Sequence, residues 1–192
     1  MLFIKTPMKP FFLVCAFLVS GFVQSIAQVY TAKSGSATFF SAAPLENIEA
    51  TSTSVQSILN TSTKNVAFII SIRSFQFKKD LMQEHFNENY VESDKFPKAS
   101  FKGTVSDIAS VNLAKDGTYK LKVNGQLTLH GVTKEIETIA DFTVRNGTLS
   151  ASSDFTIECA DYDIQIPGLV KDKVAKTVNI NILANYELYK AF

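Results

Sequence analysis

Residues 119–130 read YKLKVNGQLTLH, and apolar side chains alternate in them with polar ones. Because successive side chains of a β-strand point to opposite sides, this alternation predicts a strand with one buried and one solvent-exposed face. A strand of a parallel sheet, covered on both faces, would read as a continuous apolar run instead. The stretch therefore favours an antiparallel sheet. Its predicted buried face carries Tyr119, Leu121, Val123, Leu127 and Leu129.

The same alternation recurs on both sides of this stretch. Short polar segments separate the repeats, and KDG at 115–117, HG at 130–131 and NG at 146–147 suit tight reversals. About eight strands with short connections predict an all-β fold, an eight-stranded antiparallel up-and-down barrel. Such a barrel is either filled by its side chains or holds one small ligand. The other strands are predicted at 36–42, 48–57, 65–75, 99–108, 136–144, 149–157 and 178–188.

Residues 79–90 break the alternation and predict a short helix. Met82, Phe86 and Tyr90 recur every four residues, as on the apolar stripe of an amphipathic helix. A helix inserted between two barrel strands has to lie at a rim, so this stripe should face the barrel mouth. Two roles stay open: the stripe lines the entrance of a cavity, or it plugs one end of a packed core. The sequence alone favours the plug.

The first 27 residues read as a signal peptide. Lys5 and Lys9 precede an uncharged apolar run of 13 residues at 11–23, and small residues at Ser25 and Ala27 suit a signal peptidase. The run is shorter than the roughly 20 residues that a membrane-spanning helix needs. We therefore expect a mature domain at 28–192 that is periplasmic or secreted. An uncleaved N-terminal anchor is the alternative.

Charge and cysteine content restrict the partners of this mature domain. Removing Lys5 and Lys9 from the 19 basic residues leaves 17 against 18 acidic ones, so neither nucleic acid nor an anionic membrane surface is an expected partner. Cys159 is the one cysteine left, which allows no internal disulfide. It continues the apolar phase of Phe155 and Ile157, and we interpret it as a small core residue.

Catalytic chemistry is not expected. His85 and His130 lie on different predicted elements without metal-ligand spacing, and we interpret each as a solvated or edge residue. Glu135 with Glu137, and Asp161 with Asp163, share a face if these segments are strands, as on any solvated face. The sequence holds no nucleophile elbow, P-loop or dinucleotide-binding motif. We expect no catalytic residue, no metal ligand and no cofactor.

Aromatic content points to the barrel interior. The chain has 16 Phe and no Trp, and 11 of the Phe lie beyond residue 27. They form either a densely packed core or the wall of an apolar lumen. If the lumen is open, the phase of the strands predicts its ligand-binding residues: Phe68, Ile70, Ile72, Phe101, Leu127, Leu129, Phe142 and Ile180 on the wall, with Met82 and Phe86 at the mouth.

Four segments, taken in order, resemble the YceI-like family, also called the polyisoprenoid-binding family. They read FQFKKDLMQEHF at 75–86, YVESDKFPKASFKG at 90–103, GQLTLHGVTK at 125–134 and DFTI at 154–157. The resemblance spans 28–188, and the third segment is the most specific. It implies an extended, lipocalin-like eight-stranded barrel that binds a long-chain isoprenoid lipid, such as an isoprenoid quinone or a polyprenyl chain. The chain departs from much of the family at 161–167, where DYDIQIP stands in place of glycine.

Other interpretations stay open. The chain ends in Phe192, as outer-membrane barrels often do, but Lys190 falls on the apolar phase of the last strand and the polar faces are charged throughout. We therefore expect no stable membrane insertion. A barrel enzyme acting on a bound lipid through His130 or Glu135, and a filled barrel with a stress-response or adhesion role, are further alternatives. A closed barrel has few free edges, which favours a monomer or weak homodimer.

Overall fold

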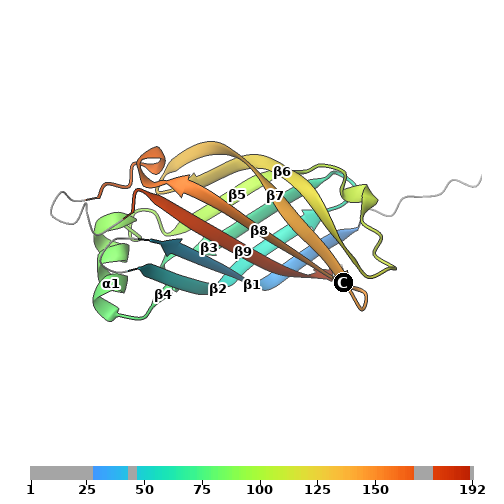
Figure 1. The fold of residues 1–192 in the computed structure, drawn as a ribbon, viewed down its shortest axis with the longest axis horizontal. Helices are drawn as coiled ribbons and strands as arrows, with labels where there is room; N and C mark the ends of the chain where they lie inside the picture. The colour runs from blue at the N-terminus through green and yellow to red at the C-terminus, as the bar shows by residue number, and fades with distance from the viewer. Residues whose placement is uncertain (1–27, 43–46, 167–174, 191–192) are drawn as a thin grey trace, which may run out of the picture.

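The structure is a computed structural model that describes residues 28–42, 47–166 and 175–190. The predicted signal peptide at 1–27, Pro167 and the terminal Phe192 lie outside these described residues. Nine strands make up most of the described chain (Figure 1). They are β1 (Val29–Ser41), β2 (Ile48–Asn60), β3 (Asn65–Ser71), β4 (Gln76–Phe77), β5 (Lys98–Val105), β6 (Gly117–Leu129), β7 (Val132–Arg145), β8 (Thr148–Glu158) and β9 (Thr177–Leu188).

The strands close into a barrel. They pair antiparallel in the order β1-β9-β8-β7-β6-β5-β3-β2, and β1 also pairs with β2, which joins the two ends of the sheet. Eight strands therefore form the ring, and β4 is an additional short strand on β2. The predicted fold class, an eight-stranded antiparallel barrel with one short helix, is confirmed.

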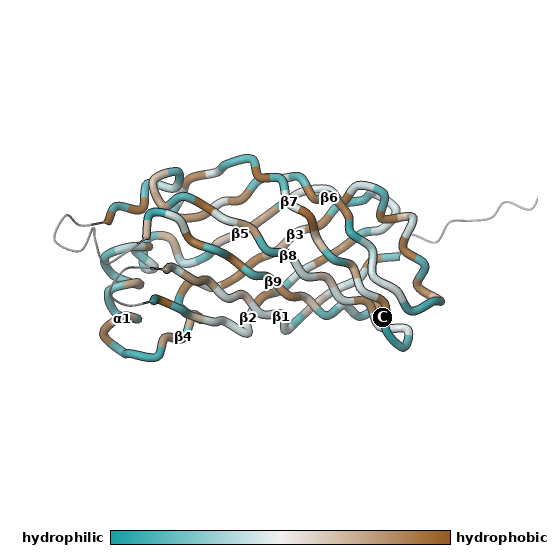
Figure 2. Tube along the Cα trace, viewed as in Figure 1, coloured by the Kyte–Doolittle hydropathy of each residue, from teal (hydrophilic) through white to brown (hydrophobic). Residues whose placement is uncertain are grey.

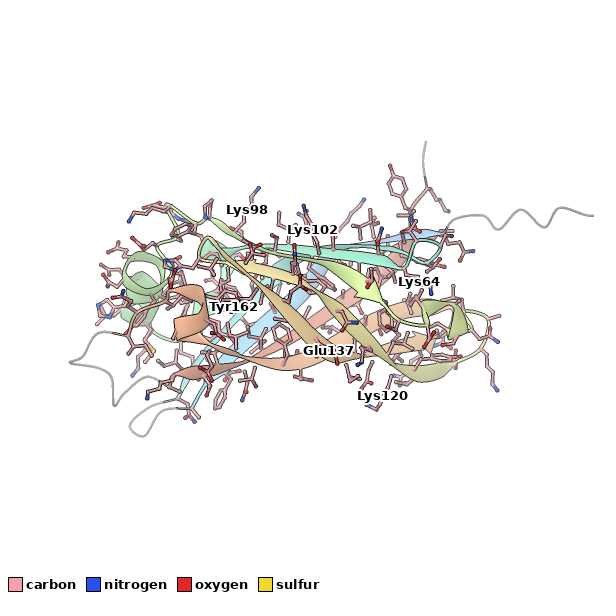
Figure 3. All side chains as sticks on the ribbon, turned by 90° about the horizontal axis from the view of Figure 1, so that it is seen from above. Lys64, Lys98, Lys102, Lys120, Glu137 and Tyr162 are labelled. Carbon is pink, nitrogen blue, oxygen red and sulfur yellow. The ribbon has the colours of Figure 1, made fainter. Side chains whose placement is uncertain are left out.

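Alternating side chains separate the interior of the barrel from its outer surface. Leu121, Val123 and Leu127 of β6 are buried, whereas their neighbours Lys120 and Lys122 are exposed. Figure 2 shows hydrophobic and hydrophilic residues alternating in this way along the strands, and Figure 3 shows Lys98 and Lys102 pointing outward from β5. The two-residue period of a strand thus places the apolar side chains inside.

Two of the three predicted reversals are tight hairpin turns. His130 and Gly131 have φ values of 50° and 75°, and Asn146 and Gly147 have 50° and 74°, as both central residues of a type I′ turn require. The third prediction is wrong. Residues 115–116 end a longer connection, 106–116, and Gly117 already belongs to β6. Within this connection, the 3-10 turn η3 (Ile108–Ser110) buries Ile108 in the core.

The strand predicted at 65–75 is interrupted. β3 ends at Ser71, the 3-10 turn η1 (Ile72–Ser74) buries Ile72, and β4 then pairs with Ala50 and Thr51 of β2. The hydroxyl of Ser74 donates to the Ser71 carbonyl, which stabilises the turn. The β3–β5 ladder therefore ends at Ser71, and the chain from 78 to 97 covers this end of the barrel.

The covering segment contains the predicted helix. α1 (Asp80–His85) continues directly into η2 (Phe86–Tyr90), a single π-helical turn, so the observed helical segment of 80–90 agrees with the predicted 79–90. π turns are rare and occur frequently at functional sites. In Figure 1 the helix lies at one end of the barrel, and β9 finishes toward the other. We call these the helix end and the far end.

The far end is packed solid. Leu59, Val144, Leu149 and Tyr186 are each no more than 2 % exposed. Ser57 Oγ donates to the Ala67 carbonyl at 3.0 Å, so the Tyr186 hydroxyl donates to Ser57 Oγ at 2.7 Å. Burial raises the pKa of Tyr186 to about 12, and the phenol therefore stays protonated and keeps this hydrogen bond across the physiological range.

Candidate binding cavity

The helix-end part of the barrel encloses a cavity of about 560 Å³. This volume lies within the range of roughly 300–1,000 Å³ that is typical of small-molecule sites. Its lining is almost wholly aliphatic and aromatic, and none of the described lining residues is Lys, Arg, Asp or Glu. The interior is therefore an oily space, suited to an apolar ligand and costly for a charged one.

All ten predicted ligand-binding residues, eight from the strand phase and two from the helical stripe, lie on the cavity wall. They are Phe68, Ile70, Ile72, Met82, Phe86, Phe101, Leu127, Leu129, Phe142 and Ile180. Ile72 reaches the wall from the turn η1, which corrects its predicted place in a strand at 65–75. That these residues contact a ligand stays a prediction.

The apolar stripe of the helix faces the cavity. Met82, Phe86 and Tyr90 line it, whereas Leu81 is 61 % exposed on the outer side. The helix thus lies over an open space and is not merely a plug above a packed core. The sequence-based preference for the plug is wrong, because periodicity shows which face is apolar and not what lies beneath that face.

An aromatic cluster that the sequence analysis missed surrounds Phe86. Its ring lies 5.2 Å from that of Phe39, 5.9 Å from Phe75 and 5.0 Å from Phe77. Such tilted and stacked rings pack favourably at these centroid distances. The cluster joins η2 to β1 and to the η1–β4 segment. The alternation of Ala37, Phe39 and Ser41 could have placed Phe39 inside, but the contacts of Phe75 and Phe77 depend on the unpredicted break at η1.

A pair of glycines widens the cavity near Phe101. Gly103 of β5 and Gly125 of β6 are directly paired, and a Cβ on either would lie within 2.7 Å of the Phe101 ring. The ring therefore lies over the two glycines, flat against the wall. Any side chain at these positions would push it toward the lumen. The Gly103–Gly125 pair thus keeps an aromatic wall while leaving space for a ligand.

The wall opens partly between β7 and β8. Their pairing runs only from Arg145↔Thr148 to Ala140↔Ser153, and beyond it the two strands separate toward the helix end. Hydroxyl groups replace the ladder there: Ser153 Oγ donates to the Ile139 carbonyl at 3.1 Å, and Thr138 Oγ1 lies 3.0 Å from Ser153 Oγ. These two polar residues line the cavity, but their hydroxyls are already bonded to each other and to the Ile139 carbonyl.

The side chain of His130 is largely buried, which corrects its interpretation as a solvated residue. Its side chain is 9 % exposed and packs edge-on against the Phe96 ring at 4.6 Å. Nδ1 lies 2.9 Å from the Tyr162 carbonyl, which can only accept, so Nδ1 carries a proton. Nε2 lies 3.2 Å from Glu92 Oε2 and can donate to this carboxylate when the ring is protonated. Sequence distance hid these partners, which lie 32 and 38 residues away.

Glu92 joins His130 to the segment that follows the helix. Hydrogen bonds from Lys95 and from His130 lower the pKa of the Glu92 carboxyl. The contacts of His130 tie three segments together at the helix end: the β6–β7 turn, the residues after η2, and the 3-10 turn η4 (Cys159–Tyr162). We interpret His130 as a structural residue, because both ring nitrogens face protein groups.

The acidic pairs do not form a paired-carboxylate site. Glu137 lies beside Lys122 at 2.7 Å and Glu135 accepts from Gln126 at 2.9 Å, both on the exposed outer face. Asp161 lies in η4 and Asp163 follows it with a φ of 54°, so this pair does not lie in a strand as supposed.

Within the described ranges, no three His, Cys, Asp or Glu side chains are grouped so that they could hold a metal ion. No helix in the described part of the chain has the length and hydropathy to cross a membrane.

Cys159 offers a direct probe of the cavity. It lines the cavity wall, is buried and free, and burial raises the pKa of its thiol. We expect the thiol of the folded protein to react with iodoacetamide at pH 8 on the order of tenfold more slowly than that of the urea-unfolded chain. Mass spectrometry of the alkylated protein measures both rates. An equal rate in the two states would contradict the buried position, and a further slowing upon ligand addition would place the ligand beside Cys159.

Comparison with known proteins supports one family. The model of the YceI-like domain matches residues 30–186. A polyisoprenoid-binding domain from Saccharophagus degradans, implicated in plant cell wall breakdown, has 18 % identity and a TM-score of 0.74, over 83 % of this chain and 98 % of its own. BcnA of Burkholderia cenocepacia has 15 % identity and a TM-score of 0.66, over 80 % and 96 %. A YceI protein of Campylobacter jejuni has 19 % identity and a TM-score of 0.50, over 67 % and 74 %. No curated protein matches the chain. At these identities the three structures concern the fold alone.

Proposed function

Because this chain belongs to the YceI-like domain family, we propose that it is an exported lipid-binding protein that holds a long isoprenoid-type lipid in the lumen of its barrel. The carried lipid is an isoprenoid quinone or a polyprenyl chain, held for transport, storage or sequestration. The apolar cavity of about 560 Å³ is the observation that carries this proposal. The S. degradans structure of the same fold, described as a polyisoprenoid-binding domain, supports the choice of lipid class.

The size of the cavity sets a scale for the bound chain. An apolar cavity of roughly 150 Å³ holds one benzene molecule with its six carbons. By the same proportion, the observed cavity of about 560 Å³ takes about twenty carbons. Each buried CH₂ contributes about 0.8 kcal/mol, and a neutral hydrogen bond only about 1 kcal/mol. Chain burial therefore sets the affinity, and polar groups set the orientation of the lipid.

The distribution of polarity favours a ligand inside the barrel over a barrel inserted in a membrane. A transmembrane barrel presents an apolar band to lipid and encloses a polar interior. Here the interior is apolar, and the outer surface carries ion pairs such as Lys120–Asp141 at 2.8 Å and Lys122–Glu137 at 2.7 Å. We propose that the protein acts by binding and not by catalysis, in the periplasm or outside the cell, as a monomer or weak homodimer.

Native mass spectrometry of the mature protein, purified without detergent, tests the proposal. We expect a stoichiometric mass increment, and we expect the extracted lipid to be an isoprenoid. A ligand-free mass, together with no uptake of added isoprenoid quinones or alcohols, would refute it. Turnover of the bound lipid that is lost in His130→Ala would instead establish an enzyme. The same spectra report the oligomeric state.

A further inference from the structure

Ser41 stands out among the residues that line the cavity. It is 3 % exposed, and its Oγ has no hydrogen-bond partner in the described part of the chain. Among the described residues, the other buried side-chain oxygens without a partner belong to Asn87 and Asn124, and neither of these residues lines the cavity. A buried hydroxyl without a partner costs about 1–3 kcal/mol. An orphan of this kind, located on the wall of a binding cavity, indicates a group that the ligand satisfies.

The position of Ser41 identifies the end of the cavity that would receive this group. Ser41 ends β1, two residues beyond Phe39 on the same inward face, and Phe39 stacks on Phe86 of η2. Ser41 therefore lies at the helix end. Tyr90 of η2 also lines the cavity, and its hydroxyl makes no hydrogen bond within the described residues. The other hydroxyls discussed above, those of Thr138 and Ser153, bond to each other and to strand carbonyls.

The charge of the lining limits what this group can be. The described lining contains no Lys or Arg, and His85, on the helix, is its one basic residue. Burial raises the pKa of the Tyr90 phenol, which therefore stays neutral. Among the described lining residues, a phosphate or diphosphate brought to this end would meet no fixed cation, and an unpaired charge is expensive to remove from water. Neutral hydroxyls suit a carbonyl or hydroxyl oxygen instead.

We propose that the helix end of the cavity binds the head group of the lipid, and that this head group is uncharged and bears an oxygen that forms a hydrogen bond with Ser41. This inference rests on the proposed lipid-binding function and specifies its ligand. Tyr90 offers a second hydroxyl to the same group. The apolar chain then runs toward the far end, where the packed side chains around Tyr186 limit its depth.

Three ligands with the same chain test this proposal: an isoprenoid alcohol of about twenty carbons, its diphosphate, and the corresponding hydrocarbon without a head group. Calorimetric titration of the mature protein should give at least tenfold weaker binding for the diphosphate than for the alcohol. Ser41→Ala should weaken binding of the alcohol about fivefold, the effect of one neutral hydrogen bond, and should leave binding of the hydrocarbon unchanged. Ser62→Ala, at an exposed turn of the far end, is the matched control and should change neither affinity.

The outcomes separate this inference from the function on which it rests. If the alcohol and the hydrocarbon both fail to bind to the native protein, the proposed lipid-binding function fails. If both bind but Ser41→Ala changes neither affinity, or the diphosphate binds as tightly as the alcohol, the head-group site alone is refuted. Thermal unfolding of each variant controls for a folding defect. An increased unfolding temperature of ligand-free Ser41→Ala would further support the conclusion that the buried Ser41 hydroxyl destabilises the ligand-free protein.

Discussion

Ala151→Phe should weaken binding of an isoprenoid chain of about twenty carbons at least a hundredfold and leave the fold intact. Ala151 is buried on β8 and lines the cavity, opposite Phe142 in the register of β7. The added ring is the size of benzene and takes about a quarter of the roughly 560 Å³ available. The ring excludes about six carbons of the lipid chain from the cavity. Each of these carbons contributes about 0.8 kcal/mol on burial, and a large part of this free energy is lost from the affinity. Titration with the C20 alcohol measures the change.

The matched control places the same ring on the outer surface. Asn185→Phe changes an exposed residue of β9 next to Ala184, and we expect unchanged binding. Both variants should unfold within a few degrees of the native protein, because one fills existing space and the other meets solvent. Binding that is unchanged in Ala151→Phe would show that the ligand does not occupy the cavity. Shorter chains should bind to this variant with less loss than longer ones.

Gly125→Val should destabilise the barrel by about 3 kcal/mol or more. A Cβ at position 125 would lie 2.3 Å from the Lys102 carbonyl oxygen, 2.5 Å from Gly103 Cα and 2.7 Å from the Phe101 ring. Two of these atoms belong to the backbone of the paired strand β5 and cannot turn away as a side chain can. The β5–β6 ladder therefore has to separate locally. The midpoint of urea unfolding measures the loss.

Gly147→Ala separates this steric effect from the conformational one. Gly147 has a φ of 74°, but a Cβ there would meet nothing within 4 Å. The expected cost is therefore only that of a left-handed residue, roughly 1–2 kcal/mol. If Gly125→Val costs no more than Gly147→Ala, close packing of the two strands is not what requires glycine at 125. Because Phe101→Ala leaves the backbone contacts in place, it should not rescue Gly125→Val.

The barrel was predictable because its strands alternate strictly. One solvated face and one buried face leave a period of two in the sequence, and the type I′ turns at 130–131 and 146–147 leave their own residue signature. Eight of the ten predicted cavity residues followed from the same phase, and Met82 and Phe86 followed from the helical stripe. The break at η1 did not, because Ile72 keeps the apolar phase of a strand while the backbone turns around it.

The missed features depend on contacts between distant segments. His130 is polar and follows a strand, so nothing local shows that Glu92 and the Tyr162 carbonyl bury it. Ser41 lies on the inward phase of β1, but only the three-dimensional structure shows that its Oγ has no hydrogen-bond partner among the described residues. Whether the lumen is filled or open depends on the volume that side chains leave between them. Sequence periodicity contains no information on that volume.

The packed far end restricts the route by which a lipid could enter and leave the barrel. With Leu59, Val144, Leu149 and Tyr186 closing that end, a lipid held as proposed would have no way through the barrel there and would leave toward the helix end, from which it came. A chain inserted tail first would then leave head first, so an acceptor would meet the polar end of the cargo before any of its hydrocarbon. If the proposed role is transport, donor and acceptor would use the same entrance, and loading and delivery would follow one another in each round.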